Sequence, residues 1–321
     1  MTEHFVLPTP DDRVLPFQVE GLDVRGRVVR LGPAVDAVLA RHDYPAPVSK
    51  LLGEAVALTV LLGTSLKIDG RFQLQTRSDG PVEMLVVDFE APDRLRAYAR
   101  YDAERIAAMK VAPPEQSGAM LGKGHLAMTV DPGAERTRYQ GVVALEGHGL
   151  EEAAHQYFRQ SEQIPTRVRL AVAEAIGGGS HAWRAGGILV QFLPEGGRRM
   201  ADLPPGDAPV GLETPDRPEE DDAWVETRLL VDTVEDHELI DPTVTSEELL
   251  VRLFHERGVR VFQPQAVHES CRCSRPRILS MLKSFTPDER RDMTGDDGAI
   301  TVTCEFCSTT YRVDPAEVER P

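Results

Sequence analysis

The sequence lacks a long apolar run. Its longest mostly apolar stretch, between Glu54 and Lys67, has only 12 residues, whereas a helix needs about 20 to cross a bilayer, so we expect no transmembrane helix and no membrane partner. The opening residues, MTEHFVLPTPDDR, are acidic and proline-containing, unlike a secretory signal. Cysteine is scarce, with four in 321 residues. The few cysteines and the lack of a secretory signal predict a cytoplasmic location. There, cysteines serve as metal ligands or redox centres more often than as structural disulfides.

An excess of basic residues is also missing. The 36 Lys and Arg are outnumbered by 52 Asp and Glu, a net charge of −16, which disfavours a nucleic acid as partner. The acidity is local, because Asp202–Glu248 holds 16 acidic residues and two arginines. Within and just before it, the passage Pro194–Asp222 holds six prolines and four glycines. Such a composition indicates a linker that buries little apolar surface.

The chain therefore divides into three parts. Residues 1–195 form a body, 196–263 an acidic linker, and 264–321 a piece that holds every cysteine. Period-two alternation predicts strands at Leu22–Leu31, Phe72–Arg77, Val82–Phe89 (after an Asp79–Gly80 turn), His125–Asp131, Tyr139–Leu145, Arg167–Ala173 and Ile188–Leu193. Helical patterns begin at Pro33 and cover Lys50–Leu66 and Leu150–Gln160. Hairpin strands with helices to one side predict an α+β body with antiparallel sheets.

Two helices are predicted in the linker. The first, Asp222–Asp236, carries Ala223, Thr227, Leu230 and Val234 at helical spacing. The second begins at a capping box of Thr245 and Glu248 and ends at Gly258; its apolar face consists of Leu249, Leu250, Leu253 and Phe254. Isolated helices are marginal below about 12–15 residues. Both should therefore be metastable and depend on a surface to which they dock.

The four cysteines form the strongest chemical signal. Cys271 and Cys273 are one close pair, and Cys304 and Cys307 are another. Four thiolates form the tetrahedral sulfur set of a structural zinc site, so all four are predicted to bind one Zn²⁺ per chain. Helices capped by Ser274 and by a Thr286–Glu289 box, then a strand at Ala299–Thr303, would close the loop between the pairs, and a short strand at Thr309–Val313 follows. His268 is interpreted as a surface residue.

The same spacings suit oxidation. A Cys-x-Cys and a Cys-x-x-Cys pair can each form a local disulfide, and Arg272, Arg275 and Arg277 would favour thiolates around the first pair. A structural zinc contributes roughly 10–16 kcal/mol to folding of a small domain, whereas closing so short a loop by a disulfide contributes only about 2 kcal/mol. Oxidation that ejects zinc should unfold this domain, and the marginal helices before it could then lose their docking surface.

Several motifs together resemble the heat shock protein 33 family of redox-regulated holdase chaperones. Besides the cysteine spacing, they are Leu51-Leu-Gly-Glu-Ala55, Leu61-Leu-Gly-Thr-Ser-Leu-Lys67, Asp79-Gly-Pro81, Leu121-Gly-Lys-Gly124, Tyr157-Phe-Arg-Gln-Ser-Glu-Gln-Ile-Pro165 and Trp183-Arg-Ala-Gly-Gly187. The chain departs from the family at Arg96-Ala97-Tyr98, where an Arg-Gly-Tyr stretch is usual, and in a longer Pro/Gly-rich passage.

The resemblance implies a zinc-bound, reduced, inactive monomer. Oxidation would pair Cys271 with Cys273 and Cys304 with Cys307, release zinc and unfold the linker. The activated chain would form a homodimer and hold unfolding client proteins without ATP. In agreement with this, the sequence has no phosphate-binding loop of the GxxxxGK[ST] type, and no catalytic residue is predicted.

The linker's apolar stripe would then contact clients. The residues concerned are Ala223, Leu230, Val234, Leu249, Leu250, Leu253 and Phe254, together with the body surface that they cover. Alternatively, they only stabilise the reduced state. Two other functions stay open at this point: a thiol–disulfide oxidoreductase that uses Cys304 and Cys307, although a thioredoxin-like pair begins a helix, and a zinc-ribbon adaptor for nucleic acid.

Overall fold

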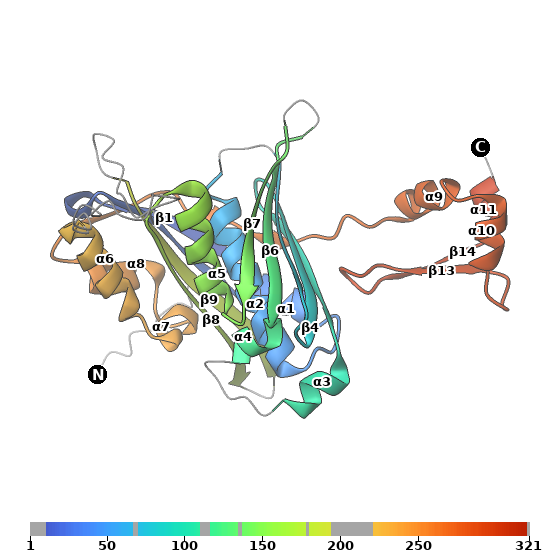
Figure 1. The fold of residues 1–321 in the computed structure, drawn as a ribbon, viewed down its shortest axis with the longest axis horizontal. Helices are drawn as coiled ribbons and strands as arrows, with labels where there is room; N and C mark the ends of the chain where they lie inside the picture. The colour runs from blue at the N-terminus through green and yellow to red at the C-terminus, as the bar shows by residue number, and fades with distance from the viewer. Residues whose placement is uncertain are drawn as a thin grey trace, which may run out of the picture.

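The computed structural model describes residues 11–66, 70–109, 116–133, 137–177, 180–193 and 221–319. Two mainly antiparallel sheets enclose helix α2 (Ala46–Gly63), the linker helices cover the outer face of one sheet, and the cysteine-containing domain projects on the side of the other (Figure 1). This confirms the predicted α+β class. The Pro/Gly-rich passage predicted as a linker lies, up to residue 220, outside the described residues.

The first sheet has the order β10-β1-β2-β9-β8, with β11 also beside β1. Its strands are β1 (Arg13–Val19), β2 (Val24–Leu31), β8 (Thr166–Gly177), β9 (Ser180–Phe192), β10 (Val259–Val261) and β11 (Gln265–Ala266). Successive side chains of a strand point to opposite faces. On β1, Val14 therefore joins the core around α2, whereas Leu15 and Phe17 join an apolar cluster on the outer face. Both faces of this sheet are thus covered.

The second sheet has the order β12-β5-β4-β3-β6-β7. Its strands are β3 (Arg71–Ser78), β4 (Val82–Glu90), β5 (Arg94–Tyr101), β6 (Lys123–Asp131), β7 (Tyr139–Glu146) and β12 (His268–Glu269). β3 and β4 pair antiparallel across the predicted Asp79–Gly80 turn. β12 instead lies parallel to β5. This short strand brings the chain from the linker to the first cysteine.

Helix α2 is the centre of the core. It is long and apolar enough, by length and composition alone, to cross a membrane, yet 78% of it is buried within the fold. Residues from both sheets pack around it, including Leu31, Leu74 and Val87. A helix that is apolar all round is expected at such a position in a large core. The shorter apolar run counted from the sequence omits its first two turns.

Other helices flank the sheets. They are α1 (Pro33–Leu39), α3 (Ala103–Ala108), α4 (Gln116–Leu121) and α5 (Leu150–Tyr157), the last of which continues as a π-helical turn (Phe158–Glu162). α1 begins at Pro33 and α5 at Leu150, as predicted.

The described part of the linker, residues 221–263, forms three helices where two were predicted. They are α6 (Asp222–Asp232), α7 (Asp236–Ile240) and α8 (Ser246–Phe254). The predicted Asp222–Asp236 helix ends early because Glu235 and Glu238 form a capping box that begins a new helix. The buried face of α6 is also shifted, since Trp224, Thr227 and Val231 are its buried residues. Ala223 and Leu230 are only half-buried.

The capping of α8 agrees with the sequence. Thr245 Oγ1 accepts from the Glu248 N–H (2.9 Å), and the Glu248 carboxylate accepts from the Thr245 N–H (2.8 Å). Gly258, with φ of 74°, donates its N–H to Phe254 O at 3.1 Å. Leu249, Leu250, Leu253 and Phe254 are all buried.

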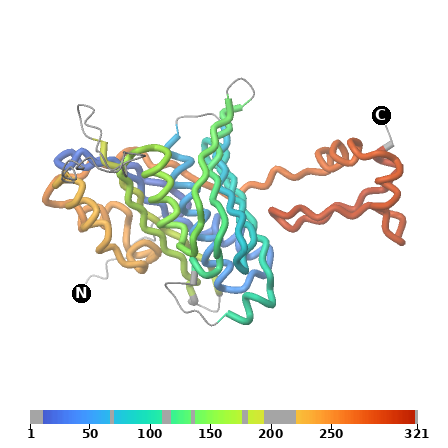
Figure 2. The backbone as a smooth tube through the Cα atoms, viewed as in Figure 1, coloured from blue at the N-terminus to red at the C-terminus, as the bar shows by residue number. Residues whose placement is uncertain are grey.

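The surface under the linker belongs to the body. Every member of this outer apolar cluster lies before residue 260, so among the described residues the cysteine-containing domain contributes nothing to it. The sequence predicted that the linker helices could lose their docking surface when that domain unfolds. The structure shows that any such effect must pass through β10, β11 and β12, which carry the chain across the body (Figure 2).

Truncating Phe254 tests this docking. Its ring is 1% exposed and lies 5.9 Å from the ring of Phe17 on β1, centroid to centroid. Because Phe→Ala in a core costs about 3–5 kcal/mol, Phe254→Ala should speed hydrogen exchange across α6–α8 in the reduced protein. Val251→Ala, on the same helix but 53% exposed, should change it little. Equal protection in the two variants would show that the linker is not held by this contact.

Candidate metal centre and its contacts with the body

The cysteine-containing domain has a small core of its own. Its elements are α9 (Arg275–Lys283), α10 (Pro287–Asp292), β13 (Ile300–Thr303), β14 (Thr310–Val313) and α11 (Pro315–Glu319). Four residues are fully buried in it: Leu282, Ile300, Val313 and Val318. The Thr286–Glu289 capping box is present as predicted, whereas Ser274 takes the N-cap position of α9 without a side-chain hydrogen bond. Four buried residues are too few to stabilise a fold of this size without a bound metal or a disulfide cross-link.

The second cysteine pair lies in the turn of the β13–β14 hairpin. Cys304 N–H donates to Thr309 O (3.0 Å) and Ser308 N–H to Cys304 O (2.8 Å), and Ser308 has φ of 55°. This tight turn directs both Cys304 and Cys307 toward the segment that follows β12. The first pair, Cys271 and Cys273, lies on that segment. Cys304 and Cys307, being in a hairpin turn, do not begin a helix, which argues against a thioredoxin-like arrangement.

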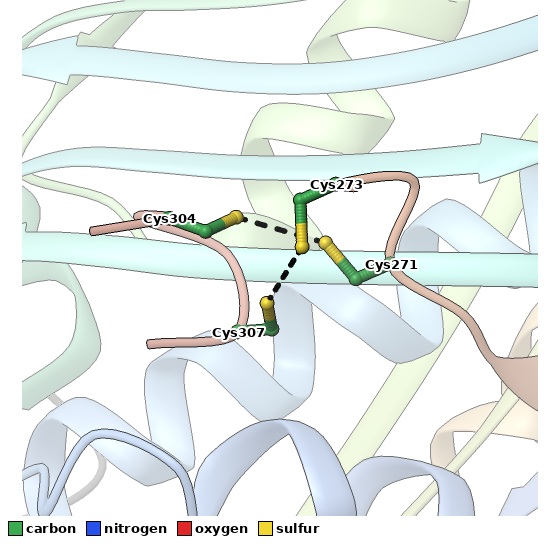
Figure 3. Close-up of side chains that lie close together, drawn as sticks. All are labelled: Cys271, Cys273, Cys304 and Cys307. Atoms are coloured by element: carbon green, nitrogen blue, oxygen red, sulfur yellow. Dashed lines mark hydrogen bonds between the residues drawn. The ribbon is translucent and has the colours of Figure 1, made fainter. Parts of the chain in front are cut away.

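The four sulfurs converge (Figure 3). They all lie within 4.8 Å of one another, with the Cys271 and Cys304 sulfurs 3.7 Å apart and the Cys273 and Cys307 sulfurs 3.3 Å apart. Sulfurs arranged tetrahedrally about a zinc ion at about 2.3 Å are separated by about 3.8 Å. The cluster thus fits a four-coordinate ion of zinc's size, and its all-sulfur donor set is one that zinc prefers.

Two of the thiols, Cys273 and Cys307, differ strongly in acidity. Burial raises the pKa of Cys273 to about 12, although the Tyr311 hydroxyl donates to its sulfur at 3.2 Å. Burial also acts to raise the pKa of Cys307, but hydrogen bonds with Thr309 and with the neighbouring cysteines outweigh it and lower the pKa to about 6. Thiols this different do not all ionise at neutral pH by themselves. A bound divalent cation is what would keep all four as thiolates.

The predicted role of three arginines is not what the structure shows. Arg272 turns toward Asp88 (3.4 Å) and Glu90 (3.5 Å) of the body, because these carboxylates lie opposite it on β4. Arg275 pairs with Glu317, and Arg277 donates to the Arg272 carbonyl. The described contacts of these guanidinium groups thus go to oxygen atoms. His268 is 57% exposed at its side chain, as predicted for a surface residue.

Residues between the cysteines dock on the second sheet. The Phe306 ring packs edge-on against Tyr98 (4.8 Å between centroids), and the Arg96 guanidinium lies 3.8 Å above it. Glu305 pairs with Arg100 (3.1 Å). Asp88, only 2% exposed, accepts from Arg96 and also contacts Arg272. Each cysteine pair is therefore positioned against β4 and β5.

The preceding segment is fixed on the same side. Glu269 forms a two-pronged ion pair with Arg41 (2.5 and 2.7 Å), and Ser270 N–H donates to Leu95 O (2.9 Å). The pKa of Arg41 is raised first by its hydrogen bond to Glu269 and, more weakly, by Cys307 and Cys271. Arg41 is thus close enough to the sulfurs for their charge to affect it. Sequence reasoning missed it because it lies more than 200 residues from them.

Comparison with known proteins agrees with this architecture. A family model described as "Hsp33 protein" matches residues 12–314. The chain is 48% identical over 308 residues to the 33 kDa chaperonin of Caulobacter vibrioides, covering 95% of both proteins. It is 34% identical to the 33 kDa chaperonin of Photobacterium profundum, covering 96% of this chain and 94% of that one. The crystal structure of the 33 kDa chaperonin of Thermotoga maritima superposes with a TM-score of 0.74 at 20% identity, over 96% of this chain and 97% of that one.

Proposed function

The chain belongs to the Hsp33 family, and from that premise we propose that it is a redox-regulated, ATP-independent holdase. The family and the relatives named 33 kDa chaperonin support a chaperone that binds unfolded client proteins. In the proposed cycle the reduced, zinc-bound chain is inactive, and oxidation of its four cysteines exposes the client-binding surface. The three-part division at residues 195 and 263 is part of the proposal.

The observation that carries the proposal is the position of the sulfur cluster. Cys271, Cys273, Cys304 and Cys307 bring the first residues of the domain together with the turn of its β13–β14 hairpin, and only four residues of this domain are fully buried in its core. Zinc, when bound there, would supply roughly 10–16 kcal/mol to folding, which is comparable to the whole stability of an ordinary domain. Removing it should therefore unfold residues 264–319.

Oxidation can remove the metal because it removes its ligands. Each pair of thiolates gives two electrons to a peroxide, which with two protons becomes two waters as one sulfur–sulfur bond forms. We propose the pairing Cys271–Cys273 and Cys304–Cys307 that the family resemblance implies. Two close sulfur–sulfur contacts in the reduced cluster run between the pairs, so peptide mapping of the oxidised chain is the direct test of connectivity.

Unfolding of this domain would release the C-terminal end of the linker. Phe306, Arg272 and Glu269 would lose their positions on the second sheet, and the segment β10–β12 would lose its anchor. The linker helices would then leave the first sheet and expose apolar surface, and the activated chain would pair with a second copy. The linker residues proposed to contact clients are Leu230, Val234, Leu249, Leu250, Leu253 and Phe254.

A paired measurement tests this function. Zinc content and suppression of client aggregation are measured on the reduced protein and again after peroxide at raised temperature. We expect one zinc per chain without suppression before treatment, and little zinc with strong suppression after it. Re-reduction in the presence of zinc serves as the control and should restore the first state. Full suppression by the reduced, zinc-bound protein would contradict the switch.

A further inference from the structure

The outer face of the first sheet has an unusual composition. Among the residues of β1, β2, β8 and β9 whose side chains the structure describes, those that point toward the linker are either arginine or apolar, with glycine at two positions, Gly26 and Gly186. The arginines are Arg13, Arg30, Arg167, Arg169 and Arg184. Within the described parts of these strands, no aspartate, glutamate or lysine points to this face. The face therefore combines apolar surface with positive charge.

The linker engages all five arginines. Three of them pair with linker carboxylates: Arg167 with Asp232 (2.5 Å), Arg169 with Asp236 (3.2 Å) and Arg13 with Glu247 (3.7 Å). The other two donate to backbone carbonyls. Arg184 Nε donates to Ile240 O (2.7 Å).

Arg30 makes the largest set of these contacts. Its guanidinium donates to the carbonyls of Glu238 (2.6 Å), Leu239 (3.0 Å) and Asp241 (3.1 Å) at the end of α7. The residue is 1% exposed. Burial lowers its pKa to about 10, so it stays charged at neutral pH. The last carbonyls of a helix carry partial negative charge and lack hydrogen-bond donors within the helix. Arg30 supplies those donors.

The body itself neutralises this face only partly. Asp11, just before β1, pairs with Arg184 at 2.6 Å. Glu151 on α5 lies 3.5 Å from Arg169. Arg13, Arg30 and Arg167 take their acceptors from the linker. When the linker leaves, these three charges are uncovered amid apolar surface.

This chemistry restricts what can replace the linker. An apolar segment laid over the face would leave buried arginines unpaired, which is strongly unfavourable. A basic segment would add repulsion. A segment that carries apolar residues together with carboxylates, or that presents a helix C-terminus, would satisfy both components. We propose that the uncovered first sheet binds acidic amphipathic segments of unfolding proteins, and that the linker occupies the site in the reduced state as a segment of that kind. The proposal rests on the proposed holdase function.

Peptides with the sequence of residues 221–258 provide the probe. The wild-type peptide, labelled with a fluorophore, is titrated with the peroxide-oxidised full-length chain and followed by anisotropy. An on-face peptide carries Asp232→Asn, Asp236→Asn and Glu247→Gln. An off-face peptide of equal net charge carries Asp222→Asn, Glu226→Gln and Glu256→Gln, none of which pairs with these arginines in the structure.

We expect the on-face peptide to bind at least tenfold more weakly than the wild-type peptide, and the off-face peptide to bind within about twofold of it. The difference should shrink in 0.5 M salt, because the pairs are partly exposed. The reduced chain, whose linker is docked, should bind all three weakly. In the oxidised chain, Arg167→Gln combined with Arg169→Gln should remove most of the discrimination.

Two outcomes would overturn the inference: equal affinity for the on-face and off-face peptides, or no binding of any peptide. Suppression of client aggregation, measured on the same oxidised sample, separates the two levels. Suppression without a preference between the peptides overturns the charge selectivity and leaves the holdase function intact. Absence of both suppression and peptide binding overturns the proposed function as well.

Discussion

Replacing Cys304 with serine is expected to abolish zinc binding and to unfold the C-terminal domain while the body stays folded. A serine hydroxyl is not ionised at neutral pH and is a poor ligand for zinc, so three sulfurs remain of the four that converge. The metal is expected to contribute about 10–16 kcal/mol, and four buried side chains cannot replace it. Zinc analysis should fall from one ion per chain to nearly none. Amide exchange should become fast from β12 onward, and then in α8 as β10 loosens from β1.

Glu305→Gln is the matched control. This residue lies between the same two cysteines, is exposed, and forms a surface ion pair with Arg100. Exposed ion pairs are worth about 0–1 kcal/mol, so this variant should retain one zinc and a folded domain. If the metal-free Cys304→Ser protein melted as cooperatively as the zinc-bound wild type, the zinc would not be what holds this domain together.

The candidate site was largely predictable from the sequence. All four cysteines fall in two close pairs, and chemistry gives such a set few alternatives to a metal centre. What the sequence could not supply is the surroundings of the sulfurs. Phe306 and Arg272 point to partners on β5 and β4 that are roughly 180 to 210 residues away in the sequence. Such contacts depend on tertiary structure, and the arginines near the first pair were therefore given the wrong partners.

The fold was predictable where its patterns were long. Helix α2 and hairpins such as β3–β4 follow directly from periodicity and turn residues. β1 was missed because Pro16 interrupts it, and the structure shows why the proline is tolerated: on that side the partner strand is split into β10 and β11. Strands of two or three residues, such as β12, have no period to detect.

The arginines of the first sheet illustrate a different limit. Arg30 and Arg184 occur in apparently ordinary strands, and nothing local marks them as buried. The signal becomes visible only when the strand faces are assigned, because the same face then carries every arginine that meets the linker. Trp224 was missed for a similar reason, since the helical stripe was placed one residue out of register.

Replacing Arg30 with alanine is expected to undock the linker without any oxidant. The substitution removes three hydrogen bonds to carbonyls at the end of α7, those of Glu238, Leu239 and Asp241, and empties the space of a buried side chain. Removing one partner of a buried, charged contact costs about 3–5 kcal/mol, which is large for three short helices. In the reduced protein, amide exchange in α6–α8 should accelerate by at least a hundredfold, and aggregation of a client should be partly suppressed.

Zinc content and a second arginine make this result specific. The Arg30→Ala protein should keep one zinc per chain, because the cysteine-containing domain lies on the other sheet's side of the body (Figure 1). Arg25→Ala changes an exposed residue of the same strand whose side chain points away from the linker, and it should leave the exchange of α6–α8 unchanged. Arg30→Lys keeps the charge but not the fork of donors, so its effect should be intermediate. If Arg30→Ala left linker exchange at the wild-type rate, the linker would be held by its apolar contacts alone.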